Sequence, residues 1–397
     1  MSLPEQFSEL VQQHLHDDVQ QLALQRNRFP QLSDADFRFL LQQIEGRQRT
    51  CEKLPTLSAL PDWWFPVRLS CEQCSSEATA RYKVAIVQSF NLQPSTLDHK
   101  PSTLDTFIDL TAGYGIDTFH LAATAGEAHY VERNAELCAI AEHNFQLYRP
   151  HIQVHNTTAE SFLASLPISD TRYPISDTPY PLPNSPASHT LIYLDPARRS
   201  QSGGKVFRIE DCEPNVIELL PALRMHADRI LIKFSPMLDI TAALRVLGSD
   251  WDTHIVAVNN EVKEVLFLTG KGVIHAVNIR TREMRTDRFC FSPEDEKHSP
   301  LHLAPAIQQY IYEPNAAIIK AGAYRLIAEQ YGLSKLDVNT HLYTSDTFMS
   351  GFPGRIWQVV EDIKEPKKQL DKSARYSILS RNYPLSPEEI RKKYKLR

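Results

Sequence analysis

The sequence predicts an α/β protein whose main domain is a largely parallel, Rossmann-like sheet covered by helices on both faces. Between about residues 106 and 270, short apolar segments of strand length alternate with segments of helical periodicity. Five such strand-then-helix units favour parallel strands, because a parallel crossover needs a helix-sized connection. The expected sheet has seven strands, with the sequences TFIDLT, HYVE, IQVHN, LIYLDP, RILIKF, HIVAV and EVLFLT.

The last two of these strands differ from the others. Only residues 259–263 separate HIVAV from EVLFLT, which is far shorter than a parallel crossover requires. We therefore expect an antiparallel hairpin at the end of the sheet.

Composition is consistent with a folded, intracellular chain. The 397 residues are 42% hydrophobic and 23% charged, which argues against a wholly disordered protein. No apolar run approaches the roughly 18–20 residues of a membrane span, and the polar N-terminus lacks the apolar centre of a secretory signal. Six cysteines in so long a chain do not form a disulfide framework, and Cys71-x-x-Cys74 has no second pair at zinc spacing. We expect a reduced, cytoplasmic protein without a bound metal.

Changes in pattern along the chain predict four regions. A helical N-terminal region comes first, with a helix start signal at Ser33, and a basic region with a helix start at Ser386-Pro387 comes last. Between them lie the main α/β domain and a small region that mixes the strand-like VIHAVNI with a helical stretch near residues 316–330. The predicted boundaries are 1–75, 76–270, 271–350 and 351–397.

Two tandem repeats interrupt the pattern. PSTLD occurs at residues 94–98 and again at 101–105, and PISDTRY at 167–173 returns as PISDTPY at 174–180. Neither repeat has apolar periodicity, and prolines are frequent in the second. We expect both to be surface loops that take no part in catalysis.

A glycine motif follows the first strand of the main domain. In FIDLTAGYGIDT (residues 107–118), the strand ends at Asp109, and Gly113-x-Gly115 leads into a helix. Glycine lets the backbone turn sharply and approach a ligand closely. Glu132, at the end of the second strand, is placed to accept hydrogen bonds from both ribose hydroxyls of a nucleoside. Thr118 replaces the third glycine of a dinucleotide fingerprint, which favours S-adenosyl-L-methionine over NAD as the cofactor.

The fourth strand ends in the second motif, LDPARR (residues 194–199). The carboxyl ends of such strands line the ligand crevice. Asp195 and the carbonyl of Pro196 could accept hydrogen bonds from an exocyclic amine that receives a methyl group. The alternative is a strand-terminal turn in which Asp195 forms a salt bridge.

The two motifs and the strand order resemble those of class I methyltransferases that use S-adenosyl-L-methionine. The resemblance implies that the glycine loop contacts the methionine part, that Glu132 holds the ribose and that Glu160 lies near the adenine. The implied cofactor-binding residues are Asp109, Thr111, Gly113, Gly115, Asp117, Glu132 and Glu160.

The LDPARR segment resembles the (D/N)PP(Y/F) loop of methyltransferases that act on the amino groups of bases. It departs from that loop at Ala197, in place of the second proline, and at Arg198, in place of the aromatic ring. An arginine plane can stack on a base and pair with phosphate. The implied catalytic residues are Asp195, Pro196 and Arg198.

Much of the chain beyond residue 50 is similar to a bacterial group of methyltransferases with a C-terminal THUMP-like domain. The segments that carry this resemblance are CSSEATARYK, YLDPARR, KFSPMLD, YEPNAAIIKAGAYRLIAE, FPGRIWQV and RNYPLSPEEIRKK. The resemblance implies a small ferredoxin-like module within 271–350 and a THUMP-like domain over 351–397. Such domains continue past the final helix into a further strand, so we expect an incomplete domain here.

The charge distribution points to a polyanionic partner. Twelve Lys or Arg residues and six Asp or Glu residues follow residue 354, whereas the whole chain has a net charge of −5. THUMP domains bind structured RNA, so the resemblance implies RNA contacts by the basic tail, namely Arg355, Lys367, Lys368, Arg381, Arg391, Lys392 and Lys393. The sequence thus predicts an enzyme that methylates a base of structured RNA. Two alternatives stay open: methylation of a protein or small molecule, and an RNA-binding protein with a vestigial cofactor fold.

Overall fold

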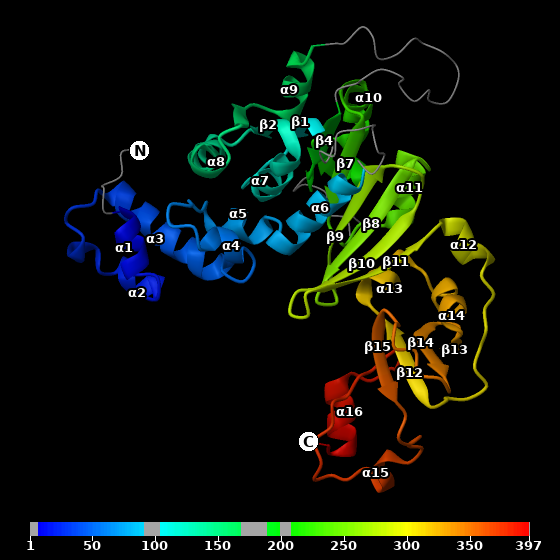
Figure 1. The fold of residues 1–397 in the computed structure, drawn as a ribbon. Helices are drawn as coiled ribbons and strands as arrows, with labels where there is room; N and C mark the ends of the chain where they lie inside the picture. The colour runs from blue at the N-terminus through cyan, green and yellow to red at the C-terminus, as the bar shows by residue number, and fades with distance from the viewer. Residues whose placement is uncertain (1–6, 91–103, 168–188, 199–207, 397) are drawn as a thin grey trace, which may run out of the picture. The chain divides into compact units, whose positions relative to one another are not determined.

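A computed structural model describes residues 7–90, 104–167, 189–198 and 208–396, and it divides the chain into two compact units. The first unit comprises Met1–Asp252 and Lys263–Lys271, and the second comprises Thr253–Val262 and Gly272–Arg397. Figure 1 shows the elements of both. In the described part of the chain, no helix is both long and apolar enough to cross a membrane. Both repeated loops fall almost entirely outside the described residues, so their predicted role as surface loops stays a prediction.

The first unit begins with helices, as predicted. Ser33 caps the longest of them, because its side chain accepts a hydrogen bond from Asp36 N (3.1 Å), and Phe37, Leu40 and Ile44 of that helix are buried. The helices before the sheet are α1 (Phe7–Gln13), α2 (Val19–Ala23), α3 (Asp34–Thr50), α4 (Pro55–Ser58), α5 (Arg68–Gln73) and α6 (Glu77–Ser89).

The sheet of the first unit has the strand order β9-β7-β4-β1-β2-β3. All of these strands run parallel except β9, which is antiparallel to β7. Every residue of β4 is buried, as expected for a central parallel strand with both faces covered. The strands are β1 (Leu104–Asp109), β2 (Ala125–Glu132), β3 (Ile152–Asn156), β4 (Thr190–Leu194), β7 (Arg229–Phe234) and β9 (Glu261–Thr269).

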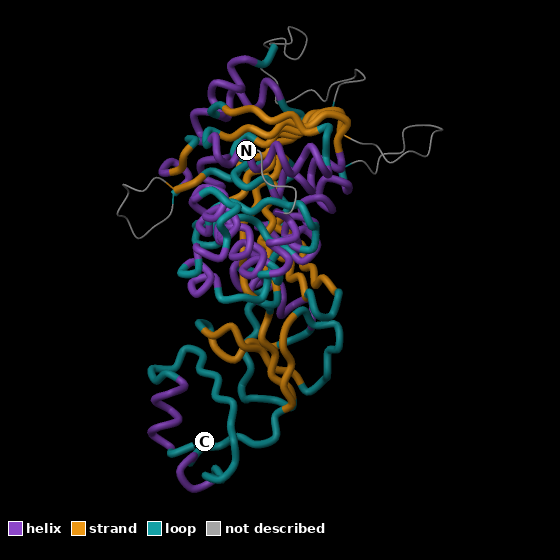
Figure 2. The backbone as a smooth tube through the Cα atoms, turned by 90° about the vertical axis from the view of Figure 1, so that its left-hand side faces the viewer, coloured by secondary structure: helices purple, strands orange, loops and turns teal. Residues whose placement is uncertain are grey.

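Helices follow the parallel strands in sequence and lie on both sides of them, as Figure 2 shows. One apolar core includes Ile192 and Ile230 of the strands together with Phe162, Leu223 and Leu247 of three helices. The helices of this part are α7 (Ile116–Leu121), α8 (Ala135–Tyr148), α9 (Ala159–Ser165), α10 (Val216–His226) and α11 (Ile240–Leu247), and a short ribbon pairs β5 (Ala197–Arg198) with β6 (Cys212–Glu213).

The predicted hairpin is confirmed. Strand β8 (Trp251–Val258) neighbours β9, and only Asn259 and Asn260 connect them. Both asparagines have positive φ angles, 50° and 69°, as the tight turn of a two-residue hairpin requires. The connection is shorter than the five residues expected, because β9 already begins at Glu261.

The sheet continues two strands beyond the seven that were expected. In the second unit, β10 (Ile274–Arg280) pairs in parallel with β8, and β11 (Arg285–Phe291) pairs antiparallel with β10. The strand-like VIHAVNI therefore belongs to this sheet. Its local sequence predicts a strand but does not indicate whether that strand joins this sheet or the smaller sheet that follows.

A separate four-stranded antiparallel sheet follows in the second unit, in the order β13-β14-β12-β15. The helical stretch expected near residues 316–330 is two short helices, because Gly322 adopts a left-handed conformation (φ 82°) that ends the first. The elements are α12 (Pro293–His298), β12 (Tyr310–Pro314), α13 (Ala316–Ala321), α14 (Leu326–Tyr331), β13 (Ser334–Asp337), β14 (Thr340–Ser345), β15 (Gly354–Gln358), α15 (Pro366–Gln369) and α16 (Pro387–Tyr394).

Candidate active site

A cavity of about 630 Å³ opens in the first unit at the carboxyl ends of β1, β2, β3, β4 and β7. This volume is in the roughly 300–1,000 Å³ range of small-molecule sites. The strand order reverses between β1 and β4, and open α/β sheets bind their ligands at such a reversal. Eight of the ten predicted site residues line this cavity: Asp109, Thr111, Gly113, Gly115, Asp117, Glu132, Glu160 and Asp195.

The other two predicted residues are placed differently. Pro196 is buried and does not appear in the cavity wall. Arg198 belongs to β5, and its side chain lies outside the part of the molecule that the structure describes. The predicted stacking and phosphate contacts of Arg198 therefore stay a prediction.

The glycine loop between β1 and α7 has a backbone that larger residues would strain. Gly113 and Gly115 have φ angles of 54° and 83°. A Cβ atom on Gly115 would come within 2.9 Å of the Phe145 ring and 3.1 Å of the Tyr130 ring. Tyr130 also donates a hydrogen bond from its hydroxyl to the carbonyl oxygen of Gly113 (2.5 Å). Tyr130 of β2 and Phe145 of α8 thus hold the loop in place and leave no room for a side chain at Gly115.

Glu132 at the end of β2 is tied to that loop. Its Oε2 accepts a hydrogen bond from Gly113 N (3.0 Å), and its Oε1 accepts one from Asn134 N (2.8 Å). An ionised carboxylate has about four acceptor positions, so both oxygens can accept further hydrogen bonds from a ligand. Glu132 therefore fixes the glycine loop and presents acceptors to the cavity at the same time.

Asp109 is almost completely buried, with 1% of its surface exposed. Its carboxyl accepts hydrogen bonds from Thr118 Oγ1 (2.6 Å) and Thr111 N (3.1 Å). Burial raises the pKa of Asp109 to about 8, although these two hydrogen bonds act in the opposite direction. Thr118, which stands in place of the third glycine, therefore has a structural role, because its hydroxyl donates a hydrogen bond to the buried carboxyl group of Asp109.

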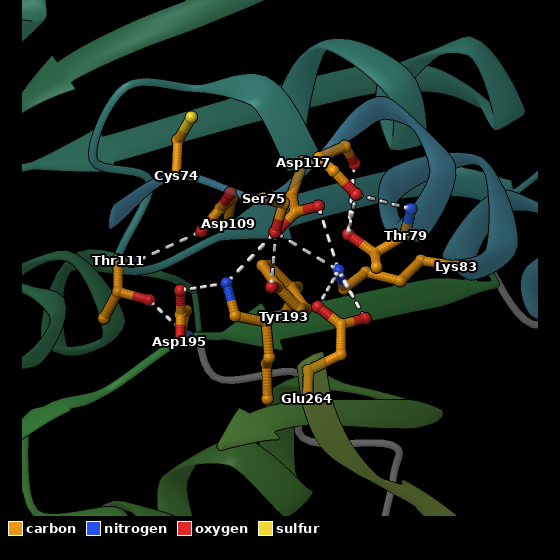
Figure 3. Close-up of polar contacts among 12 residues, drawn as sticks. Cys74, Ser75, Thr79, Lys83, Asp109, Thr111, Asp117, Tyr193, Asp195 and Glu264 are labelled. Atoms are coloured by element: carbon orange, nitrogen blue, oxygen red, sulfur yellow. Dashed lines mark hydrogen bonds and ion pairs between the residues drawn. The ribbon is translucent and has the colours of Figure 1, made fainter. Parts of the chain in front are cut away.

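Asp117, in the first turn of α7, is the centre of a buried polar cluster (Figure 3). Its Oδ2 accepts hydrogen bonds from Ser75 Oγ (2.6 Å) and Tyr193 Oη (2.7 Å), and its Oδ1 accepts one from Lys83 Nζ (3.1 Å). Burial alone would raise the pKa of Asp117, but the ammonium groups of Lys83 and Lys233 hold that pKa well below its usual range. Asp117 is therefore ionised, and it anchors groups from α6, β4, β7 and the loop between α5 and α6.

Lys83, on α6, has no exposed surface. Its Nζ lies 2.8 Å from Glu264 Oε1 and 3.1 Å from Asp117 Oδ1, as Figure 3 shows. Burial raises the pKa of Glu264, whereas the ammonium group of Lys83 lowers it. A buried lysine is stable only when opposite charges and hydrogen bonds replace its hydration, and both conditions hold here.

Asp195, at the end of β4, is paired with Lys233 of β7. The distance between Lys233 Nζ and Asp195 Oδ2 is 2.5 Å, and Lys233 Nζ also lies 3.0 Å from Ser75 Oγ. Burial alone would lower the pKa of Lys233, but Asp195 and Asp117 raise it above its usual range. The backbone N–H of Asp195 donates to Thr111 Oγ1 (2.5 Å), so both the backbone and the side chain of Asp195 are fixed.

Sequence reasoning missed three members of this cluster, Ser75, Lys83 and Glu264. One signal was available for Lys83, which lies on the same face of α6 as the buried residues Thr79 and Ile86. A lysine on an apolar helix face requires a buried partner. The sequence contains no indication of which acid supplies it, because Glu264 lies 181 residues further along the chain.

The C-terminal part of the chain matches two known domain families. Residues 310–353 match a ferredoxin-like domain family, and residues 354–397 match a THUMP domain-like family. The structure agrees with a small module here, and it also shows that β15, the first strand of the THUMP-like segment, pairs with β12 of the ferredoxin-like segment.

The sheet order and the cavity define a class I methyltransferase fold. The chain is 30% identical to a "putative methyltransferase" of known crystal structure from Porphyromonas gingivalis W83, with 100% of this chain and 93% of that one covered and a TM-score of 0.80. The chain belongs to that family of methyltransferases with C-terminal ferredoxin-like and THUMP-like domains.

The names of two more distant relatives include a cofactor. Two proteins from Mycobacterium tuberculosis strains CDC 1551 and H37Rv, each named an uncharacterized S-adenosylmethionine-dependent methyltransferase, are 23% identical over 217 residues. The match covers 52% of this chain and 57% of the length of each relative.

Proposed function

We propose that this protein transfers a methyl group from S-adenosyl-L-methionine to a base of structured RNA. One observation carries the proposal: the glycine loop, the ribose-binding candidate Glu132 and the fixed Asp195–Lys233 pair line the same cavity. The names of the relatives support the cofactor, and the THUMP domain-like match supports RNA as the acceptor.

The residues of the cavity fit S-adenosyl-L-methionine. Gly113 and Gly115 leave backbone accessible where a larger side chain would strain the loop, and Glu132 has acceptor capacity left for ribose hydroxyls. Glu160 is exposed at the start of α9, on the part of the wall that follows β3, where the adenine is expected. When bound, the cofactor supplies a methyl group on a positively charged sulfur. The ionised carboxylate of Asp117 provides opposite charge in the same cavity.

Asp195 is the proposed acceptor of a hydrogen bond from the amine that receives the methyl group. Its Oδ2 is held by Lys233, and among the described residues no group donates to its Oδ1. In this proposal Oδ1 orients an exocyclic amine and accepts the proton that the amine loses. Lys233 holds the carboxylate in one position, which favours alignment of the reacting atoms.

We expect cofactor binding to depend on Glu132. Glu132→Ala removes the acceptors for the ribose and the anchor of the glycine loop, and each hydrogen bond to a charged group contributes roughly 1.5–3 kcal/mol. Isothermal titration calorimetry with S-adenosylhomocysteine should show at least a roughly tenfold loss of affinity, with a smaller loss for Glu132→Gln. Glu142→Ala, an exposed acid on α8, is the control. An affinity within threefold of the parent for Glu132→Ala would reject this role.

The structure separates the seven predicted RNA-binding residues into two groups. Arg355 and Arg381 both pair with Glu313, which leaves their charges partly neutralised. The remaining five lie on the last two short helices: Lys367 and Lys368 on α15, and Arg391, Lys392 and Lys393 on α16. The tail contacts with RNA are therefore proposed mainly for these two helices.

We expect Lys392→Ala/Lys393→Ala to weaken RNA binding and to reduce its salt dependence. Each phosphate contact to a single strand contributes about 0.7 to the slope of log affinity against log salt, so the double variant should lose up to about 1.4. Fluorescence anisotropy with RNA, from 50 to 300 mM salt, measures both effects. Lys297→Ala/Lys320→Ala, outside the THUMP-like segment, is the control of equal charge. An unchanged slope in the tail variant contradicts the tail contacts.

The acceptor itself is tested by methyl transfer from labelled S-adenosyl-L-methionine to an extract separated into RNA, protein and small molecules. The proposal requires label in the RNA fraction with the parent protein and far slower labelling with Asp195→Ala. Label confined to the protein or small-molecule fraction would overturn RNA as the acceptor. Cofactor binding without any transfer would indicate a vestigial fold.

A further inference from the structure

A second cavity, of about 400 Å³, lies entirely within the second unit. Its wall comes from the β8–β9 turn, from the end of β10 and the turn after it, and from the ends of β12 and β15. Figure 1 shows β10, α13, β12 and β15, which carry or flank these residues. Neither the proposed cofactor site nor the tail helices α15 and α16 contribute to this wall.

Two asparagines of the wall have fixed orientations. Asn315 Oδ1 accepts hydrogen bonds from Ala317 N and Ile318 N (both 3.1 Å), and Asn260 Oδ1 accepts one from Ala316 N (2.8 Å). Because each amide oxygen faces backbone N–H groups of α13, each amide nitrogen must point away from that helix end. These contacts also use the first N–H groups of α13.

Both amide nitrogens are left without a partner. Asn315 is 3% exposed, and its Nδ2 is buried with no hydrogen-bond partner. Asn260 is only partly buried, and no described residue accepts a hydrogen bond from its Nδ2. A buried N–H group without a partner costs roughly 1–3 kcal/mol, so an acceptor supplied by a ligand would offset a cost already present in the free protein.

The charged residues of the wall add further donors. Arg282 is exposed and has no ion pair among the described residues, and Arg355 is more than half exposed and lies 3.9 Å from Glu313. The acidic wall residue, Glu283, is paired with Arg280 (3.2 Å). The cavity therefore combines unused amide donors with two accessible guanidinium groups, and it has few free acceptors.

We propose that this cavity binds one unpaired nucleotide of the RNA. Arg282 and Arg355 would contact the phosphate, and the amide groups of Asn260 and Asn315 would donate to carbonyl or ring-nitrogen acceptors of the base. The volume exceeds what a phosphate group alone needs. Arg355 also lies at the start of the segment that matches the THUMP domain-like family. The assignment rests on the proposed function, because it takes RNA as the ligand.

The test uses the full chain and a fluorescein-labelled, single-stranded RNA of twelve nucleotides, followed by anisotropy. Arg282→Ala should weaken binding at least threefold and reduce the salt slope by about 0.7, with partial recovery of affinity in Arg282→Lys. Asn315→Asp keeps the oxygen that caps α13 but removes the donor and adds a negative charge, and it should weaken binding at least tenfold. Arg245→Ala, an exposed arginine of the first unit, is the matched control and should bind like the parent.

Competition identifies the ligand. AMP, CMP, GMP or UMP should displace the labelled RNA at concentrations at which inorganic phosphate does not. Equal competition by phosphate, or parent-like binding by both Arg282→Ala and Asn315→Asp, overturns the assignment. A parent protein that binds neither RNA nor mononucleotides also overturns the assignment.

The nucleotide site and the proposed acceptor can fail separately. RNA binding that depends on these residues, together with methyl transfer only to a non-RNA acceptor, would support the nucleotide site while rejecting the proposed acceptor. Unchanged melting temperatures and S-adenosylhomocysteine affinities in both variants show that folding is intact.

Discussion

Asp195→Ala should slow methyl transfer by roughly 10²–10⁴-fold, because the variant loses both the orientation of the acceptor amine and the group that accepts its proton. Affinity for S-adenosylhomocysteine should stay within a few-fold, since Glu132 and the glycine loop are untouched. Single-turnover transfer of labelled methyl groups to RNA measures the first effect, and calorimetry measures the second.

The structure indicates that this variant should fold. Without the Asp195 carboxylate, Lys233 keeps Ser75 Oγ at 3.0 Å and Asp117 Oδ2 at 3.7 Å, so its charge is not left without a partner. Asp195→Asn retains a hydrogen-bond acceptor but removes the charge, and we expect partial activity from it. Glu142→Ala serves as the control for loss of an exposed acid. Parent-like transfer by Asp195→Ala would place the acceptor elsewhere, and loss of cofactor binding would assign Asp195 to the cofactor.

Lys83→Met should lower the free energy of unfolding of the first unit by about 3–5 kcal/mol, the usual cost of removing one partner from a buried ion pair. The variant leaves the buried Glu264 carboxylate without this partner and removes one of the two ammonium groups beside Asp117. Urea denaturation, followed by the fluorescence of the buried Trp63 and Trp251, measures the loss.

Two further variants distinguish charge from packing. Arg68→Met removes an exposed cation from the preceding helix, α5, where its partner Glu72 is also exposed, and it should leave the free energy of unfolding nearly unchanged, because exposed ion pairs contribute little. Lys83→Met/Glu264→Leu removes both partners of one pair and should recover part of the stability lost in Lys83→Met. A loss below about 1 kcal/mol in Lys83→Met would show that the cluster does not hold α6 against the sheet.

The sequence by itself determined the features that depend on neighbouring residues. Alternation of apolar and helical segments predicted β1 through β4 and β7, because each strand depends on local periodicity, and the short connection between the last two segments predicted the hairpin. The glycine motif, Glu132 and Asp195 were found for the same reason. Each follows a strand directly, and parallel strands bring their carboxyl ends to one edge of the sheet.

Only the tertiary structure decided which of these residues interact. The pairing of β10 with β8 extended the sheet, and the packing of α6 against α7 brought Lys83 to Asp117. The partnership of Asp195 with Lys233 depends on the adjacency of β4 and β7, and that of Lys83 with Glu264 spans most of the main domain. Local periodicity contains no information on such pairs. They form because buried charges are stable only beside opposite charges, and the order of the strands in the sheet sets which charges are adjacent.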